Sequence, residues 1–213
     1  MAHITHFLFA RHLRSDPSCH VLHYRRGRLV RSVRGASYWF LPLTAGIAEV
    51  PCDDRELAFL FHARSSDLQD VTMQGAITYR VREPEKVAAR VDFSIDVSRG
   101  TWKQRPLEQI GSLLSQLAQQ FAWVYVAHTP VREVLAEGMA HACAEIERGF
   151  AANTSLAEMG LAIVAVRVTA VSPTADLEKA LQTPTREGIQ QQADEATFRR
   201  RALAVEKERA IQE

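Results

Sequence analysis

The most regular pattern of apolar and polar positions lies between residues 71 and 82. Every second residue from Val71 to Val81 is apolar, aromatic or glycine, and the residues between them are polar or small. A period of two places alternate side chains on opposite faces of a β-strand. We therefore expect a strand with one buried and one hydrated face. Glu83-Pro84 should end it because proline cannot donate to a strand ladder, and a short helix can begin at Glu85.

The segment before this strand has the pattern of short strands separated by turns. Residues 21–50 contain Gly27 and Gly35, and glycine adopts the backbone conformations that tight turns need. The run 57–61 is a compact apolar strand candidate, and the turn-prone residues 65–67 follow it. The chain up to residue 82 is thus predicted to be rich in β-structure.

The period changes to three and four after residue 106, which predicts two amphipathic helices in tandem. The apolar stripe of the first helix consists of Leu107, Ile110, Leu114, Leu117, Phe121 and Val124. Thr129-Pro130 predicts an N-cap followed by proline at the first helical position. The second helix continues with Val131, Leu135, Gly138, Ala142 and Ile146.

Alternation returns between residues 161 and 171, after a break at 153–155. We expect a strand there that returns to the sheet and closes the domain. The residues predicted to share one face are Ala162, Val164, Val166 and Val168, with Leu161, Ile163, Arg167 and Thr169 on the other.

Past Ser172-Pro173 the chain is rich in Ala, Glu, Gln and Arg, which favours a long exposed helix. Pro184 should break or kink this helix early. It has no stop signal before Glu213, so we hypothesise that the natural chain continues. Its thin apolar stripe suits side-by-side packing of many copies better than a stable two-stranded coiled coil; the alternative is a solvated helix without a partner. The predicted oligomer interface consists of Ile189, Ala193, Ala196, Arg200, Leu203 and Ala210.

The formal net charge of +1 hides a basic N-terminal part. Residues 1–50 contain seven arginines against two acidic residues, Asp16 and Glu49. Such a patch suits an anionic lipid surface or a nucleic acid, although interleaved arginines on an edge strand also serve solubility. Three aromatic residues in a row cannot all point inward on a strand, so at least one should face outward. The predicted membrane or subunit contact consists of Arg25, Arg26, Arg28, Arg31, Arg34, Tyr38, Trp39 and Phe40; a core strand is the alternative for the aromatics.

Catalytic and metal chemistry find little support in the sequence. Cys19, Cys52 and Cys143 are odd in number and far apart, which indicates neither a disulfide framework nor a zinc site. The common catalytic motifs are absent, so we expect no enzyme activity, no cofactor and no metal. No segment has enough apolar residues to span a bilayer, and the start lacks a signal-peptide pattern. These features predict a cytoplasmic protein, peripheral at a membrane if it meets one.

Three segments resemble one family. Residues 65–86, an Asp-containing turn followed by an alternating strand that ends in Tyr79-Arg80-Val81 and then Pro84, resemble the signature of the stomatin, prohibitin and flotillin (SPFH, band 7) superfamily. Residues 159–164 are similar to its Gly-Ile-x-Val strand, and residues 171–180 to its strand-to-helix junction. Residues 26–42 look like a degenerate form of its opening strands.

The resemblance implies an α+β fold: an SPFH domain with a twisted, largely antiparallel sheet and two packing helices, then a long C-terminal helix. We divide the chain into a basic, His-rich segment (1–20), a β-rich first lobe (21–100), a helix-helix-strand second lobe (101–172) and an assembly helix (173–213). The family implies rings or cages that organise membrane patches or enclose partner proteins, with no catalytic residues. The sequence lacks the N-terminal membrane helix that many members carry, so constitutive anchoring is not expected.

The expected partners are therefore other copies of the chain and protein clients. An anionic membrane surface is the alternative, gripped by the basic and aromatic N-terminal strands. Nucleic acid is not expected, because no motif for it accompanies the basic residues.

Overall fold

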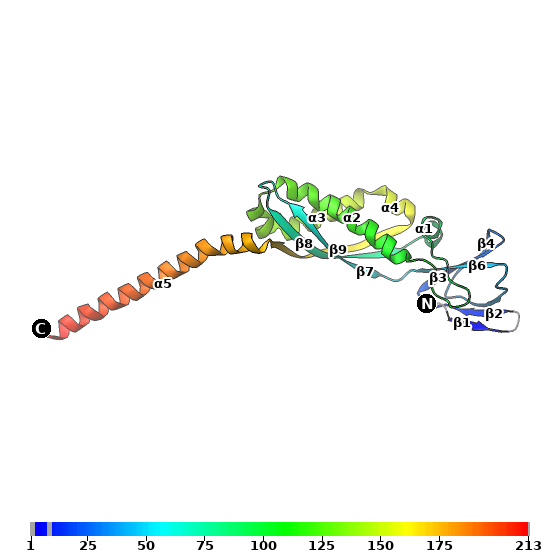
Figure 1. Cartoon of the computed structure of the whole chain (residues 1–213), viewed down its shortest axis with the longest axis horizontal. Helices are drawn as coiled ribbons and strands as arrows, with labels where there is room; N and C mark the ends of the chain where they lie inside the picture. Colours follow the sequence, from blue (N-terminus) through cyan, green and yellow to red (C-terminus); the bar gives the residue numbers. More distant parts are fainter. Residues whose placement is uncertain (1–2, 8–9, 213) are drawn as a thin grey trace.

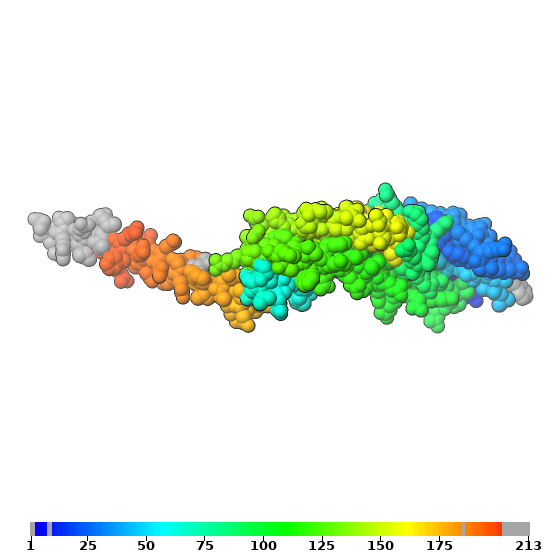
Figure 2. All heavy atoms as spheres, turned by 90° about the horizontal axis from the view of Figure 1, so that it is seen from above, coloured from blue at the N-terminus to red at the C-terminus, as the bar shows by residue number. Residues whose placement is uncertain are grey.

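The computed structural model describes residues 3–7 and 10–212, and the side chains of these residues except 185 and 202–212. The chain forms an elongated α+β body from which one long helix projects (Figure 1). In the space-filling view the helix leaves the body at the end opposite the N-terminal strands (Figure 2). The predicted fold class, with antiparallel sheets, packing helices and a C-terminal helix, is confirmed.

Two small antiparallel sheets form the N-terminal end of the body. The first has the order β1 (His3–His6), β2 (Arg11–Arg14), β5 (Ser37–Phe40), and the second has the order β4 (Arg28–Arg34), β3 (Cys19–Arg25), β6 (Ala45–Pro51). Arg26 and Gly27 connect β3 to β4, and both have positive φ, 51° and 76°. Positive φ at both central residues defines the hairpin turn whose twist matches the flanking strands.

The third sheet, with the order β7-β8-β9, forms the middle of the body. Its strands are β7 (Arg55–Arg64), β8 (Asp70–Val81) and β9 (Leu161–Pro173). Along β8 the residues from Val71 to Val81 at odd positions are all buried, and those between them are exposed or half-buried. The predicted alternation of this central strand is therefore confirmed.

The predicted facing of β9 is wrong in part, because two bulges interrupt the strand. Tyr79 pairs with Ile163 but Thr78 pairs with Ala165, so the ladder passes over Val164. A second register shift passes over Thr169. Each bulge adds one residue and reverses the facing of those that follow. The residues opposite buried positions of β8 are consequently Leu161, Ile163, Val166, Val168, Val171 and Pro173.

Four helices accompany the sheets: α1 (Pro84–Arg90), α2 (Pro106–His128), α3 (Val131–Ala152) and α4 (Thr154–Met159). α2 and α3 lie side by side against the β7-β8-β9 sheet (Figure 1). The predicted apolar stripe of α2 differs from the buried face near the C-terminal end of the helix, because Val124 is exposed. The buried line advances in steps of four and is made of Ile110, Leu114, Ala118, Ala122 and Val126.

The predicted N-cap of α3 is also wrong. α3 begins at Val131 with Pro130 in the cap position, and Thr129 ends α2. The Thr129 hydroxyl donates to the Tyr125 carbonyl at 2.9 Å instead of capping the next helix. The cap comes from another element: the Asp67 carboxylate, in the β7–β8 turn, accepts from the Val131 N–H.

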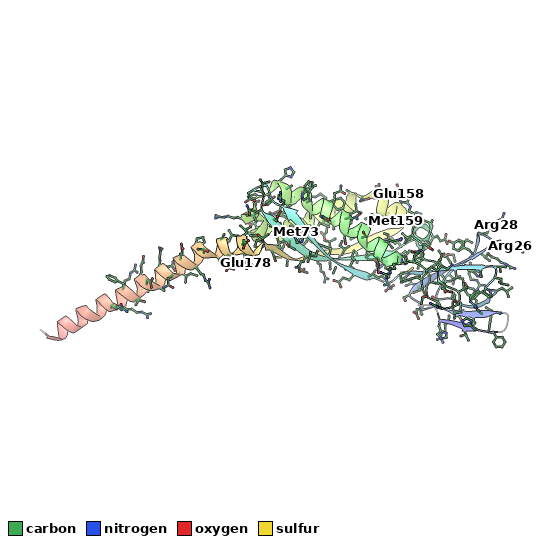
Figure 3. The ribbon with its side chains drawn as sticks, viewed as in Figure 1. Arg26, Arg28, Met73, Glu158, Met159 and Glu178 are labelled. Carbon is green, nitrogen blue, oxygen red and sulfur yellow. The ribbon has the colours of Figure 1, made fainter. Side chains whose placement is uncertain are left out.

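Buried apolar residues form two clusters. The larger one joins the β7-β8-β9 sheet to α1, α2, α3 and α4, and includes Met73, Ile77, Leu114 and Ile146. Met73, labelled in Figure 3, lies within this sheet. The smaller one lies among the N-terminal strands and consists of Leu13, Val21, Ala36, Tyr38, Phe40, Ile47 and Ile95. Each end of the body is thus held by its own set of buried side chains.

The last element, α5 (Ala175–Gln212), is one helix of 38 residues. At about 1.5 Å per residue it is about 57 Å long. Pro184, predicted to break or kink the helix, lies inside the helix and does not break it. Only its first turns approach the body, where Leu177 packs against the larger cluster.

Candidate functional site

The side chains of α5 are the first candidate surface. None of the described side chains on α5 is buried, and Ile189 is 63% exposed. Ile189, Ala193, Ala196 and Arg200 follow one another at intervals of four and three, which aligns them on one side of a helix. Of the predicted interface residues, the side chains of Leu203 and Ala210 lie outside the described residues. The structure therefore exposes the described part of the predicted stripe, with no intrachain partner packed over it.

The root of α5 adds an apolar groove of about 400 Å³ between the helix and the body. Leu135 of α3, Pro173 of β9, and Leu181 and Ile189 of α5 line it. Figure 3 places Glu178, another lining residue, where α5 leaves the body. Sequence reasoning had no signal for this groove, because its apolar residues come from three elements. The groove extends the exposed stripe of α5 that contains Ile189 towards the body of the molecule.

The N-terminal end of the body is the second candidate surface. Arg25 pairs with Ala45, which brings the β3–β4 turn next to the loop 41–44. Arg11 pairs with Phe40, which brings the start of β2 to the same place. In Figure 3, Arg26 and Arg28 extend from the end of the molecule opposite α5. The arginines of the β3–β4 turn thus surround a common tip.

Strand alternation in β5 separates its three aromatic residues. Trp39 is 58% exposed, whereas Tyr38 and Phe40 are buried in the smaller cluster. Adjacent residues of a strand point to opposite faces, so Tyr38 and Phe40, which the predicted contact surface includes, face the interior of the chain, and Trp39 faces solvent.

Other apolar side chains join Trp39 at this tip. Phe7 packs edge-on against the Trp39 ring with centroids 5.8 Å apart. Leu41 is exposed, and Leu43 is 98% exposed. Sequence reasoning missed these residues; the run Leu41-Pro42-Leu43 between two strands was the available signal.

Two of the predicted contact arginines already have partners within the chain. The Arg31 guanidinium carbon lies 4.6 Å from the centre of the Tyr38 ring. Arg34 donates to the Pro17 carbonyl at 2.9 Å. Arg25, Arg26 and Arg28 make no hydrogen bond or ion pair among the described side chains. The guanidinium groups of these three are therefore available to bind a partner.

Burial governs the titration of the groups behind the tip. It raises the pKa of Tyr38 to about 12, which the nearby Arg31 opposes. The pKa of His23, which stacks on Tyr38 at 5.4 Å, is lowered by burial and then by the charges of Arg31 and Arg25. His23 is thus held neutral close to physiological pH, so its protonation would add charge to an already basic region.

The described residues offer no group of three or more metal-ligating side chains in one place. Burial raises the pKa of the Cys19, Cys52 and Cys143 thiols, and a raised pKa disfavours the reactive thiolate. No described helix is long and apolar enough to cross a membrane.

Comparison with known proteins agrees with this architecture. The model of the SPFH domain / Band 7 family matches residues 18–204. The chain belongs to the SPFH / Band 7 family. Family members are often membrane-associated scaffolds, and the family is generally non-enzymatic. No curated protein is significantly similar to the chain in sequence. The SPFH match covers β3 to the first three quarters of α5, so both candidate surfaces fall largely within it.

Proposed function

We propose that this SPFH protein is a non-enzymatic scaffold that assembles with copies of itself, through the SPFH domain and α5, into a ring or cage. The observation that carries the proposal is the exposure of α5, where Ile189 and Phe198 are 63% and 75% exposed. In a protein, most helical stability comes from packing of an apolar face. A long helix that leaves large apolar side chains such as Phe198 exposed is explained by partners in other chains.

The composition of α5 favours many weak contacts over one strong one. Its described stripe contains two alanines and Arg200 besides Ile189, which gives each pair of helices little apolar area to bury. Copies that contact each other head to tail close into a ring when the rotation between them allows it. Each subunit then has two neighbours, and the linked contacts stabilise the whole. Such an assembly would organise a membrane patch or enclose protein clients.

Light scattering of the purified chain at low and physiological salt tests the assembly. We expect a discrete species with a mass many times that of the 23.9 kDa chain. A chain that ends after Gln182 keeps Leu177 and Leu181 at the root of α5. This shortened chain should be monomeric. Its far-ultraviolet circular dichroism should differ from that of the full chain only by the helix that was removed. Full mass in the shortened chain would refute the role of α5.

A second candidate function is peripheral binding to anionic membranes through the N-terminal tip. The observation that favours it is the combination of exposed Trp39 and Leu43 with the free arginines Arg25, Arg26 and Arg28. Amphipathic aromatic rings suit the headgroup level, and basic residues near an anionic surface contribute about 1 kcal/mol each. The two functions are compatible, because the tip and α5 lie at opposite ends of the molecule (Figure 1).

Cosedimentation with phosphatidylserine-containing and neutral liposomes tests the membrane function. Binding should require the anionic lipid, weaken with salt and fall in the variant Trp39→Ala, Leu43→Ser. The exposed Leu60→Ser, on β7 away from the tip, is the matched control. Unchanged binding by the tip variant would place the arginines at a subunit contact instead. If the chain is monomeric in solution and binds liposomes, membrane binding is the better supported of the two functions.

A further inference from the structure

A groove of about 510 Å³ lies between the start of β9, the C-terminal end of α3 and the short helix α4. Seven consecutive residues, 160–166, line it on the strand side. Because consecutive side chains of a strand point to opposite faces, this lining means that the groove runs along the edge of the strand. Phe150 of α3 and Leu156 of α4 form the apolar wall opposite.

The edge of β9 that borders the groove is available for pairing. β9 is the outermost strand of the order β7-β8-β9, and among the described residues 161–165 form no backbone hydrogen bond outside the β8 ladder. The bulge residue Val164 is half exposed at the groove. An open strand edge presents unpaired N–H and C=O groups that pair readily with an added strand.

Arg82 and Glu147 place opposite charges at the two ends of the groove; Glu83, which also lines it beside Arg82, is paired with Lys86 at 2.8 Å. Arg82 lies beside the beginning of β9, since its backbone N–H donates to the Gly160 carbonyl at 2.8 Å. Glu147 lies one helical turn from Cys143, whose sulfur is 3.4 Å from the Val166 carbonyl near the other end. Neither Arg82 nor Glu147 has a hydrogen-bond or ion-pair partner among the described side chains. Both side chains are therefore available to form ion pairs with a ligand in the groove.

We propose that this groove binds the extended C-terminal segment of a partner protein by strand addition to β9. The free carboxylate meets Arg82, and a basic side chain further back along the peptide meets Glu147. The peptide then runs antiparallel to β9, as every paired strand in the structure does. The edge from Leu161 to Val166 is about 17 Å long at about 3.4 Å per residue, which fits about five peptide residues. This binding does not depend on self-assembly.

Random octapeptides displayed with free carboxyl termini and selected on the full-length protein provide the test. We expect enriched peptides with apolar residues at alternate positions and a basic residue upstream. Synthetic fluorescein-labelled versions should bind at least tenfold more weakly to Arg82→Glu and to Ala157→Trp, which fills the groove from the exposed face of α4. C-terminal amidation of the peptide should weaken binding by a similar factor.

Two controls match these variants. Arg132→Glu reverses an exposed charge at the other end of α3, and Ala140→Trp adds a ring to the exposed side of α3 outside the groove; both should bind the peptides as the wild type does. Peptide addition should also shift the amide resonances of residues 161–165. Absence of enrichment, or equal binding by wild type, Arg82→Glu and Ala157→Trp, would overturn the proposal. If the enriched sequences match a segment of this chain, the ligand of the groove is a second copy of the chain and not a partner protein.

Discussion

The Asp67 carboxylate caps helix α3 from a distant hairpin turn: its two oxygens lie 3.2 and 3.3 Å from the backbone nitrogen of Val131. The same carboxylate accepts from the Ser65 hydroxyl, and the Ser66 N–H donates to the Thr129 carbonyl at 3.1 Å. The turn between β7 and β8 is thereby fastened to the corner between α2 and α3. The signature segment that suggested the family thus performs a structural task in this chain.

Replacing Asp67 by alanine should lower the melting temperature by several degrees, because α3 loses the acceptor for its first N–H. Asp67→Asn should retain most of the stability, since its carbonyl oxygen can still accept. Asp70→Ala is the control in the same hairpin, where it removes only an exposed pair with Arg64. Thermal unfolding by circular dichroism measures all three, and equal melting temperatures for Asp67→Ala and the control would contradict the capping role.

The same contact predicts a pH dependence. The hydrogen bond from Ser65 and then that from the Val131 N–H lower the pKa of Asp67 below that of an ordinary aspartate. A depressed pKa means that the unfolded chain binds the proton more tightly, so this contribution is present above the unfolded pKa and is lost as pH falls through the folded one. Below about pH 4 the difference in melting temperature between wild type and Asp67→Ala should therefore shrink.

Glycine-to-alanine substitutions at two helical positions should have opposite effects. A Cβ on Gly149 of α3 would lie 2.3 Å from the Phe121 ring of α2, whereas one on Gly188 of α5 would meet nothing within 4 Å. Gly149→Ala should therefore destabilise the domain by about 1–3 kcal/mol through overpacking. Gly188→Ala should stabilise α5 by about 0.5–1 kcal/mol. Urea denaturation followed by circular dichroism measures both; a stabilising Gly149→Ala would show that the helices separate at little cost.

Regular periodicity was predictable and its interruptions were not. The alternation in β8 follows from a strand buried on one face, and the structure has it from Val71 to Val81. The same reasoning failed in β9, because the bulges at Val164 and Thr169 depend on pairing with β8 and leave no local trace. In α2, Val124 and Val126 have the same chemistry, and only the position of α3 and the sheet decides that Val126 is buried.

The candidate surfaces were predictable to different degrees. Composition suffices to expect an exposed C-terminal helix, since few bulky apolar residues leave it little to bury. The N-terminal tip could not be read from the sequence alone, because Phe7 lies against Trp39 only once β2 pairs with β5, and the alternation along β5 turns Tyr38 and Phe40 inward. The groove beside β9 likewise joins residues from α3, α4 and β9, and no single segment of sequence shows it.

The stability of the N-terminal end should depend on pH through His23. Burial, then Arg31 and Arg25, lower the pKa of His23 below 6.5 in the folded chain. Between the folded and unfolded pKa values the unfolded chain binds more protons, so stability is full above about pH 6.5 and falls as the pH drops through the folded value. His23→Phe keeps the stacking on Tyr38 and should lose less stability between pH 7 and 5. Thermal unfolding at pH 7 and pH 5 measures this difference, and an equal loss of stability in the wild type and His23→Phe would contradict it.

Ile189 and Phe198, two exposed apolar residues of α5, can distinguish a ring of neighbouring helices from a single pair. Ile189 and Phe198 are nine residues apart, which at about 100° per residue places them on opposite sides of the helix. In a ring each α5 has a neighbour on both sides, so Ile189→Asp and Phe198→Asp should each reduce the assembled mass, and together should give the monomer. Thr197→Asp adds the same charge about a quarter turn from both and should leave the mass unchanged. Dissociation by Ile189→Asp with no effect of Phe198→Asp, measured by light scattering, would mean that α5 pairs through one face only and that any ring closes through the SPFH domain.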